Sequence, residues 1–408
     1  MVKRNENIRK LKSSYLFPEI NMRRKRFLEE NPEAKIISLG VGNTTEPIPQ
    51  AIIRGLEEGA NRLGTLEGYT GYGPEQGILE LRQKIAQVFY KGQIDSDDVF
   101  ISDGSKCDIG RLQLLFGPKA SMAVQDPTYP VYVDGSIMQG IGGHYDPNAC
   151  NYSGITYMPC TPENHFFPDL NNVPRTDLIY FCSPNNPTGA VATRKQLEEL
   201  VAFAKSNNSI IIYDAAYSTY IRDPSIPRSI FEIKGAEEVA LETNSFSKIA
   251  GFTGIRLGWT VVPSQLKFDD GSSVRSDWFR IMSTIFNGAS NIAQAGGLAV
   301  LEDEGLKATQ EMVGFYLENA EIIKQALQKA GYEVFGGVEA PYLWARFPDR
   351  KSWDVFQEIL EKTHIVTTPG LGYGPSGEGF VRFSAFGHRE NILEAANRLS
   401  KISVFSSR

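Results

Sequence analysis

The chain of 408 residues is poor in the residues that build metal sites and disulfides, with only four cysteines and four histidines. The cysteines show no CxxC spacing, which argues against a zinc ribbon and favours a reducing compartment. The histidines are scattered and form no HExxH sequence, so no metal is expected.

Long hydrophobic runs and an excess of basic charge are also missing. No apolar run reaches the length that spans a membrane. The formal net charge is −6, and no basic stripe with interleaved aromatics is present, so nucleic-acid binding is not indicated. The first seven residues are charged and lack the apolar core of a secretory signal. We expect a cytoplasmic protein, or a protein of the plastid stroma if a transit peptide has been removed.

Short apolar runs alternate with helical patterns through the larger part of the chain. Helices are predicted at 75–90 and 193–205, the second opened by a capping box at Thr193. Buried strands are predicted at 99–101, 122–124, 178–181, 210–213, 239–241 and 259–262. This alternation predicts an α/β fold with a mainly parallel sheet covered by helices.

Beyond residue 297 the pattern changes. Long helical patterns at 307–329 and 353–362 are mixed with short strand patterns at 342–346 and 380–383. A chain of this length can form two domains. We therefore predict a large domain at 46–296 and a smaller α+β domain made of 1–45 and 297–408.

The segment around Lys248 is the most informative part of the sequence about chemical function. Ser245 and Ser247 flank this lysine, and Arg256 follows between two glycines. Pyridoxal 5′-phosphate offers an aldehyde to a lysine and a dianionic phosphate to hydroxyls and an arginine. The segment therefore indicates this cofactor, although by itself it also fits an ordinary surface lysine and arginine in a serine-rich loop.

Two further segments follow predicted buried strands. Asp214 comes directly after the strand at 210–213, where α/β folds place their ligands, and its carboxylate can keep a pyridine nitrogen protonated. Tyr217 could donate to the phenolate oxygen of the same ring, and so could an asparagine amide in the segment 181–189. Read alone, Asp214 fits a loop cap equally well, and 181–189 fits a common tight turn.

Three other places carry less specific signals. Gly104 and Ser105 begin a predicted helix, and the N–H groups of a helix N-terminus bind phosphate. Tyr129 could stack on a cofactor ring, and Arg382, on a predicted strand, suits a carboxylate. A packed turn and a surface salt bridge are their ordinary alternatives. The GxGxxG match at 372–377 neither follows a clear strand nor opens a helix, so we interpret it as a loop.

Taken together, these segments resemble the fold type I PLP-dependent aminotransferases, over essentially the whole chain and in the same order. A narrower set is similar to the LL-diaminopimelate aminotransferase family. That set comprises residues 15–20, 39–49, 67–77, 102–109, 286–290, 363–370 and 384–391.

The resemblance implies an aminotransferase of lysine biosynthesis that moves an amino group from L-glutamate to tetrahydrodipicolinate. The products are 2-oxoglutarate and LL-2,6-diaminopimelate. Lys248 is then the Schiff-base lysine and proton carrier, Asp214 the partner of the ring nitrogen, and Asn186 and Tyr217 the partners of the ring oxygen. The phosphate would be held by Ser105, Lys106, Ser245, Ser247, Arg256 and Tyr72.

The resemblance also implies a homodimer whose active sites lie at the subunit interface, with Tyr72, Glu75 and Asn287 reaching the partner's site. Arg382 and Asn186 would take the substrate's α-carboxylate. The distal end of the substrate would be recognised by Tyr15, Gly42, Glu75, Lys106, Tyr129 and Asn287.

Two alternatives stay open at this point. One is a different PLP reaction on the same fold, such as an ACC-synthase-like lyase or an aromatic or aspartate aminotransferase. The other is a catalytically silent regulator. The short stretch before Tyr15 leaves no room for a DNA-binding helix-turn-helix, and the intact Lys248 also argues against a silent protein.

Overall fold

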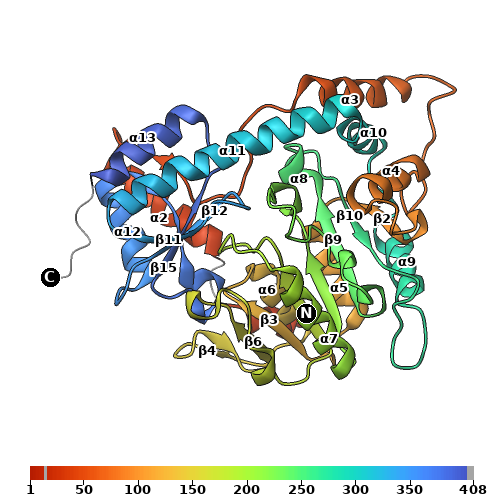
Figure 1. Cartoon of the computed structure of the whole chain (residues 1–408), viewed down its shortest axis with the longest axis horizontal. Helices are drawn as coiled ribbons and strands as arrows, with labels where there is room; N and C mark the ends of the chain where they lie inside the picture. The colour runs from red at the N-terminus through yellow and green to blue at the C-terminus, as the bar shows by residue number, and fades with distance from the viewer. Residues whose placement is uncertain (13–15, 402–408) are drawn as a thin grey trace.

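A seven-stranded sheet forms the centre of the larger part of the molecule (Figure 1). The computed structural model describes residues 1–12 and 16–401, so the predicted site residue Tyr15 lies outside the described residues. The strand order is β2-β10-β9-β8-β7-β3-β6. The strands are β2 Val99–Ser102, β3 Met122–Asp126, β6 Ile155–Pro159, β7 Leu178–Cys182, β8 Ile210–Asp214, β9 Ala240–Ser245 and β10 Gly258–Val261.

The sheet is mainly parallel, as predicted. Strands β6, β3, β7, β8 and β9 pair in parallel, and β10 runs antiparallel between β9 and β2. Because six strands point the same way, β2, β3, β7 and β8 end at one edge of the sheet. The loops and helix starts that follow them gather there, which is where α/β folds bind ligands.

Two strand predictions differ from the structure. The run at 239–241 was placed too early, because β9 continues through polar residues to Ser245. Glu242 is fully buried in β9, where Tyr90 and Ser229 donate hydrogen bonds to its carboxyl group, and such pairing lets a polar residue sit inside a sheet. Strand β6 was not predicted at all.

Helices cover the sheet. They are α3 Gln50–Arg62, α4 Leu79–Tyr90, α5 Ser105–Phe116, α6 Pro130–Gln139, α7 Arg194–Asn207, α9 Val274–Ile285 and α10 Asn291–Val300, with the short α1 Glu6–Arg9 and α8 Phe246–Ile249. The capping box of α7 is present, with Thr193 accepting from the Gln196 N–H. The prediction that a helix starts at residue 75 was wrong. Gly77 has φ +94° and a Cβ there would lie 2.3 Å from Ile101, so this stretch turns before α4 begins.

The C-terminal part builds a second, four-stranded sheet in the order β11-β12-β15-β14. The predicted strands and helices in this part are all present. The elements are β11 Glu333–Gly336, β12 Tyr342–Arg346, β14 Thr368–Pro369 and β15 Phe380–Ser384, with α11 Asp303–Lys329, α12 Ser352–Thr363 and α13 Arg389–Ser400. The segment 372–377 lies within two short 3₁₀ turns and opens no α-helix.

The N-terminal segment returns to this second sheet. Helix α2 (Leu16–Glu30) lies beside the C-terminal elements in Figure 1, and β1 (Ile37–Ser38) pairs in parallel with β13 (Ile365–Val366). A separate two-stranded ribbon joins β4 (Tyr145–Asp146) to β5 (Asn151–Tyr152). The exact division at residues 46 and 297 stays a prediction.

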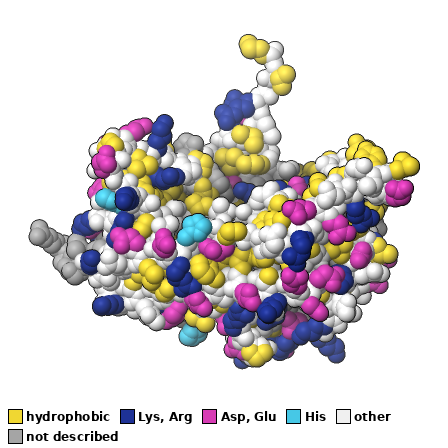
Figure 2. Space-filling view, turned by 90° about the horizontal axis from the view of Figure 1, so that it is seen from above, with side chains coloured by type: hydrophobic (Ala, Val, Ile, Leu, Met, Phe, Trp, Pro, Cys, Tyr) yellow, Lys and Arg dark blue, Asp and Glu magenta, His cyan; other side chains and the backbone are white. Residues whose placement is uncertain are grey.

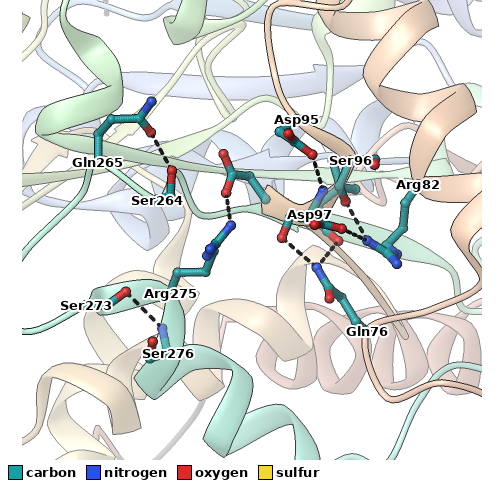
Figure 3. Close-up of polar contacts among 12 residues, drawn as sticks. Gln76, Arg82, Asp95, Ser96, Asp97, Ser264, Gln265, Ser273, Arg275 and Ser276 are labelled. Carbon is teal, nitrogen blue, oxygen red and sulfur yellow. Dashed lines mark hydrogen bonds and ion pairs between the residues drawn. The ribbon is translucent and has the colours of Figure 1, made fainter.

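A polar network fixes the loop that carries Tyr72 and Glu75 (Figure 3). The Gln76 side chain donates to the backbone oxygens of Asp97 and Val99, at 2.7 and 3.0 Å. The Ile101 N–H also donates to the Gln76 oxygen. The loop is therefore tied to the start of β2 immediately after Glu75.

The face that Figure 2 shows carries charges of both signs, with acidic and basic side chains intermixed. Within residues 1–12 and 16–401, no helix is both long and apolar enough to cross a membrane. The same residues contain no cluster of three or more histidine, cysteine or acidic side chains suited to a metal ion.

A tight backbone contact at Gly258 leads to a first prediction. A Cβ at this position in β10 would lie 2.8 Å from Gly104 Cα and 2.8 Å from the Asn244 oxygen, so the strand passes directly against the start of α5. We expect Gly258→Ala to lower the free energy of unfolding by about 1–3 kcal/mol, because the backbone must shift to admit the methyl group. Denaturant unfolding measures this effect.

Gly110→Ala is the matched control, because Gly110 lies in α5 and a Cβ added there would meet open space. Alanine should leave stability unchanged or raise it by up to about 1 kcal/mol. Equal unfolding midpoints for Gly258→Ala and the wild type would contradict the close contact between β10 and α5.

Candidate functional site

A pocket of about 370 Å³ opens at the edge of the large sheet where the parallel strands end. It lies between that sheet, the second sheet and the segment 41–43. Twelve of the residues singled out from the sequence line it: Gly42, Ser105, Lys106, Tyr129, Asn186, Asp214, Tyr217, Ser245, Ser247, Lys248, Arg256 and Arg382. They come from positions spread over the chain, and the fold brings them to one place.

Lys248 projects into this pocket from the short helix α8. Ser245 caps that helix by accepting a hydrogen bond from the Ser247 N–H at 3.1 Å. The Lys248 ammonium donates to the Gly42 carbonyl oxygen. Burial, together with the positive charges of Arg382 and Arg256, lowers the pKa of Lys248 to about 8. The side chain can therefore act as a neutral amine at mildly basic pH.

Arg256 and the start of α5 form one wall. Gly104 has φ +119°, and a Cβ there would lie 2.7 Å from the Arg256 guanidinium. Glycine thus allows the guanidinium to lie directly over the turn before Ser105. With the hydroxyls of Ser245 and Ser247 lining the same pocket, this wall offers N–H groups, hydroxyls and a fixed positive charge to an anion.

Asp214 forms the floor. Its carboxylate accepts hydrogen bonds from the Tyr132 hydroxyl at 2.7 Å and the Ala216 N–H at 3.1 Å. Burial raises the pKa of Asp214, while these two donors pull it down. Within the described parts of the chain Asp214 makes no ion pair, so a buried carboxylate faces the pocket without a directly bonded cation.

Arg382 closes the opposite side. Its guanidinium is buried, with 1% of the residue exposed, and donates to Asn186 Oδ1 at 2.7 Å and the Gly40 oxygen at 2.6 Å. Its Nε has no hydrogen-bond partner among the described residues. The ring of Tyr342 lies 4.3 Å below the guanidinium carbon. Arg382 is therefore held rigidly, and its hydrogen bonds to Asn186 and Gly40 leave further guanidinium N–H donors for a ligand.

Three predicted site residues do not line this pocket. Tyr72 and Asn287 are exposed, and Glu75 is half-buried. A Cβ at Gly288 would lie 3.2 Å from the Pro74 oxygen, so the segments carrying these residues lie side by side. They form a small surface of their own outside the pocket.

Two tyrosines in the pocket were missed. Tyr132 lies three residues after Tyr129, and this nearness was the one signal for it in the sequence. Its hydrogen bond to Asp214 is seen only in the structure. Tyr342 begins a correctly predicted strand, but nothing in the sequence joined it to Tyr217. Their hydroxyl oxygens are 2.6 Å apart although the residues are 125 positions apart.

A second cavity, of about 640 Å³, lies next to the first. The two share Lys106. The larger one is lined by parts of the N-terminal segment, α5, α6 and the turn at 371–374. The two cavities are therefore neighbours on either side of Lys106.

The comparisons with known proteins agree with this site. The family model "Aminotransferase class I and II" matches residues 34–399. A chloroplastic LL-diaminopimelate aminotransferase of Arabidopsis thaliana is 60% identical over 402 residues, which cover 98% of this chain and 87% of the relative. An LL-diaminopimelate aminotransferase of Protochlamydia amoebophila is 56% identical and covers 98% of this chain and 97% of its own.

A solved structure agrees as well. The L,L-diaminopimelate aminotransferase of Chlamydomonas reinhardtii matches with a TM-score of 0.95 and 59% identity, over 99% of both chains.

The electrostatics of Lys248 lead to the second prediction. In protein stripped of ligands, acylation of Lys248 should reach half its maximal rate near pH 8, because the pKa of this lysine is lowered to about 8 and only the neutral amine reacts. Arg382→Met should move that midpoint upward, since removing a nearby positive charge favours the protonated amine.

Peptide mass analysis after brief acylation across a pH series measures both midpoints, and the exposed Lys195 serves as the internal reference. An unchanged midpoint in a folded Arg382→Met protein would show that Arg382 does not act on Lys248.

Proposed function

Because the chain belongs to the class I and II aminotransferases, we propose that it is an LL-diaminopimelate aminotransferase that uses pyridoxal 5′-phosphate. It moves the amino group of L-glutamate to the ring-opened keto form of tetrahydrodipicolinate and releases 2-oxoglutarate and LL-2,6-diaminopimelate. The observation that carries the proposal is the meeting of Lys248, Asp214 and Arg382 in one pocket. Similarity to proteins of that name, at 60% and 56% identity over 98% of this chain, accompanies it.

The residues of the pocket fit the cofactor. Arg256, Ser245, Ser247 and the start of α5 suit a phosphate dianion. The buried carboxylate of Asp214, which makes no ion pair with any described residue, suits a protonated ring nitrogen. When bound, pyridoxal phosphate supplies an aldehyde for the amine and a ring that withdraws electrons from the substrate's α-carbon.

Each remaining step belongs to side chains of the protein. Lys248 Nζ takes a proton from the substrate's α-carbon and would pass it to the former aldehyde carbon of the bound cofactor, and its lowered pKa of about 8 makes the neutral base available. Arg382 and Asn186 bind the α-carboxylate and so fix the orientation of the carbon that loses the proton. The Tyr217 hydroxyl donates to the ring oxygen.

The distal end of the substrate extends past Lys106 and Tyr129 toward the second cavity. Glu75 and Asn287 come from the partner subunit of a homodimer and complete this end of the site. Their exposure, and the contact between the two segments that carry them, supports this assignment. Tyr72 reaches the partner's phosphate site from the same surface. The compartment, cytoplasm or plastid stroma, stays a prediction.

Substrate stereochemistry provides the third prediction. The protein should use LL-diaminopimelate with 2-oxoglutarate at a kcat/KM at least about tenfold above that of the meso isomer, because wrongly placed distal groups leave buried polar partners unpaired at about 1–3 kcal/mol each. Aspartate and aromatic amino acids should be poor donors, while L-glutamate is used with tetrahydrodipicolinate as acceptor.

Arg382→Lys is the matched control, because Arg382 binds the α-carboxylate that both isomers share. It should lower kcat/KM for the two isomers by the same factor. Equal kcat/KM values for LL- and meso-diaminopimelate in the wild type would leave a general aminotransferase instead.

The shared site provides the fourth prediction. Lys248→Ala and Asn287→Ala homodimers should each be nearly inactive. After verified subunit exchange at equal amounts, about a quarter of wild-type activity should return, since half the dimers are mixed and each mixed dimer holds one intact site of two. Absence of recovery would mean that Asn287 acts within its own subunit.

A further inference from the structure

Tyr342 and Tyr217 form a buried pair of hydroxyls at the junction of the two sheets. Tyr342 begins β12 in the second sheet, and Tyr217 follows β8 of the large sheet. Their hydroxyl oxygens are 2.6 Å apart, and 1% and 6% of the two residues are exposed. The rings meet edge to face, with centroids 5.2 Å apart. This contact joins the second sheet to a residue that faces the cofactor.

The proton positions in this pair follow from the available acceptors. Among the described residues, the only hydrogen-bond partner of the Tyr342 hydroxyl is Tyr217. Both tyrosines line the pocket, so the direction of this bond depends on which hydroxyl donates to the bound cofactor. Because Tyr217 gives its one proton to the ring oxygen in the proposed function, Tyr342 must donate to Tyr217. The proton of Tyr217 is then directed to the pocket that Tyr217 lines.

The ring of Tyr342 has a second contact. The Arg382 guanidinium carbon lies 4.3 Å from its centroid, a cation–π distance. The hydroxyl also occupies the space beside Gly42, where a Cβ would lie 2.1 Å from it. A single side chain thus supports the arginine for the substrate's carboxylate, touches the segment that accepts from Lys248, and reaches Tyr217.

We propose that Tyr342 is a positioning residue: its hydroxyl commits the Tyr217 proton to the ring oxygen of the cofactor, and its ring supports Arg382. This inference rests on the proposed function, because it assigns a task toward pyridoxal phosphate. Hydrogen-bond donors in a chain strengthen one another, so a Tyr217 hydroxyl that accepts from Tyr342 is a better donor to the ring oxygen.

Other charged and titratable groups lie around the pair. Arg382 and Cys182 act on both hydroxyls. Asp214, Lys248 and Arg256 line the same pocket. Each of these groups is unchanged in a Tyr342→Phe protein, which removes one hydroxyl and keeps the ring under Arg382. That variant therefore isolates the hydroxyl.

The experiment is a spectroscopic pH titration of the cofactor-loaded, substrate-free protein, together with the dissociation constant of pyridoxal phosphate. A donor to the ring oxygen favours its charged form, so losing part of that donation should raise the pH midpoint of the absorption change. We expect a rise of about half a pH unit for Tyr342→Phe, a threefold change in the equilibrium, and a larger rise for Tyr217→Phe. Cofactor affinity should fall in both variants.

The double variant tests whether Tyr342 acts through Tyr217. If it does, Tyr217→Phe/Tyr342→Phe has the midpoint of Tyr217→Phe alone, since the second hydroxyl then has nothing to act on. A further shift in the double variant, or a Tyr342→Phe midpoint equal to that of the wild type, would overturn the proposal.

Tyr316→Phe is the control for a merely structural loss. The Tyr316 hydroxyl is buried in the same aromatic cluster and accepts from the Thr45 and Glu46 N–H groups, both at 2.8 Å. Its loss should lower thermal stability and leave the cofactor midpoint unchanged. A midpoint shift as large as that of Tyr342→Phe would assign the effect to packing and contradict the proposal.

Tyr342→Leu removes both the hydroxyl and the ring, whereas Tyr342→Phe removes only the hydroxyl, so comparing them separates the contact with Tyr217 from the contact with Arg382. Tyr342→Leu also replaces Tyr342→Phe if that variant does not fold. It should raise the cofactor midpoint in the same direction and also raise KM for L-glutamate, because Arg382 loses the ring beneath it. Tyr342→Phe should leave KM nearly unchanged. A wild-type protein with no cofactor absorption band would instead refute the proposed function, so the two failures are distinguishable.

Discussion

The burial of the Arg382 guanidinium is the constraint on which the rest of the site depends. A buried positive charge is tolerated only when its donors are paired, and the Arg382 partners come from Asn186 and Gly40. The arginine therefore holds together the second sheet, a loop of the large sheet and the N-terminal segment. The same segment supplies the Gly42 oxygen to which Lys248 donates. The packing that satisfies Arg382 thus also positions the amine.

Positively charged side chains outnumber negatively charged ones in the pocket. Lys248, Arg256 and Arg382 face a single buried carboxylate, Asp214. This excess of positive charge lowers the pKa of Lys248 and at the same time favours anionic ligands. Phosphate and carboxylate groups of the proposed ligands would lie against this positive charge.

Glu75 and Asn287, which we propose take part in substrate recognition, lie outside the pocket of their own chain. The segment of Glu75 is fixed to the body of the molecule through Gln76 and the start of β2. The segment of Asn287 is joined to it through Asn291, which donates to Gly71. A rigid, exposed surface of this kind suits a task across a subunit interface. The proposed homodimer would then be needed for substrate binding. Each pocket would lack the side chains for the distal end of the substrate until a second chain supplies them.

What the sequence alone determined is local. Helix α7 was predicted from its capping box, and the buried strands from short apolar runs, because such signals depend on neighbouring residues. Lys248, Asp214 and Arg256 were also found in this way, since each lies in a short segment whose residue types suit one ligand group. Their resemblance to a known family then supplied the roles that spacing could not.

Tertiary structure decided the rest. The pairing of Tyr342 with Tyr217, the packing of Gly258 against the start of α5, and the hydrogen bond from Arg382 to Gly40 join residues far apart in the chain. The late start of α4 depends on the Ile101 side chain beside Gly77, and the full length of β9 on the partners of Glu242. Each of these features depends on which distant residue packs against it. A local sequence pattern does not contain this information, because such contacts form only when the chain folds.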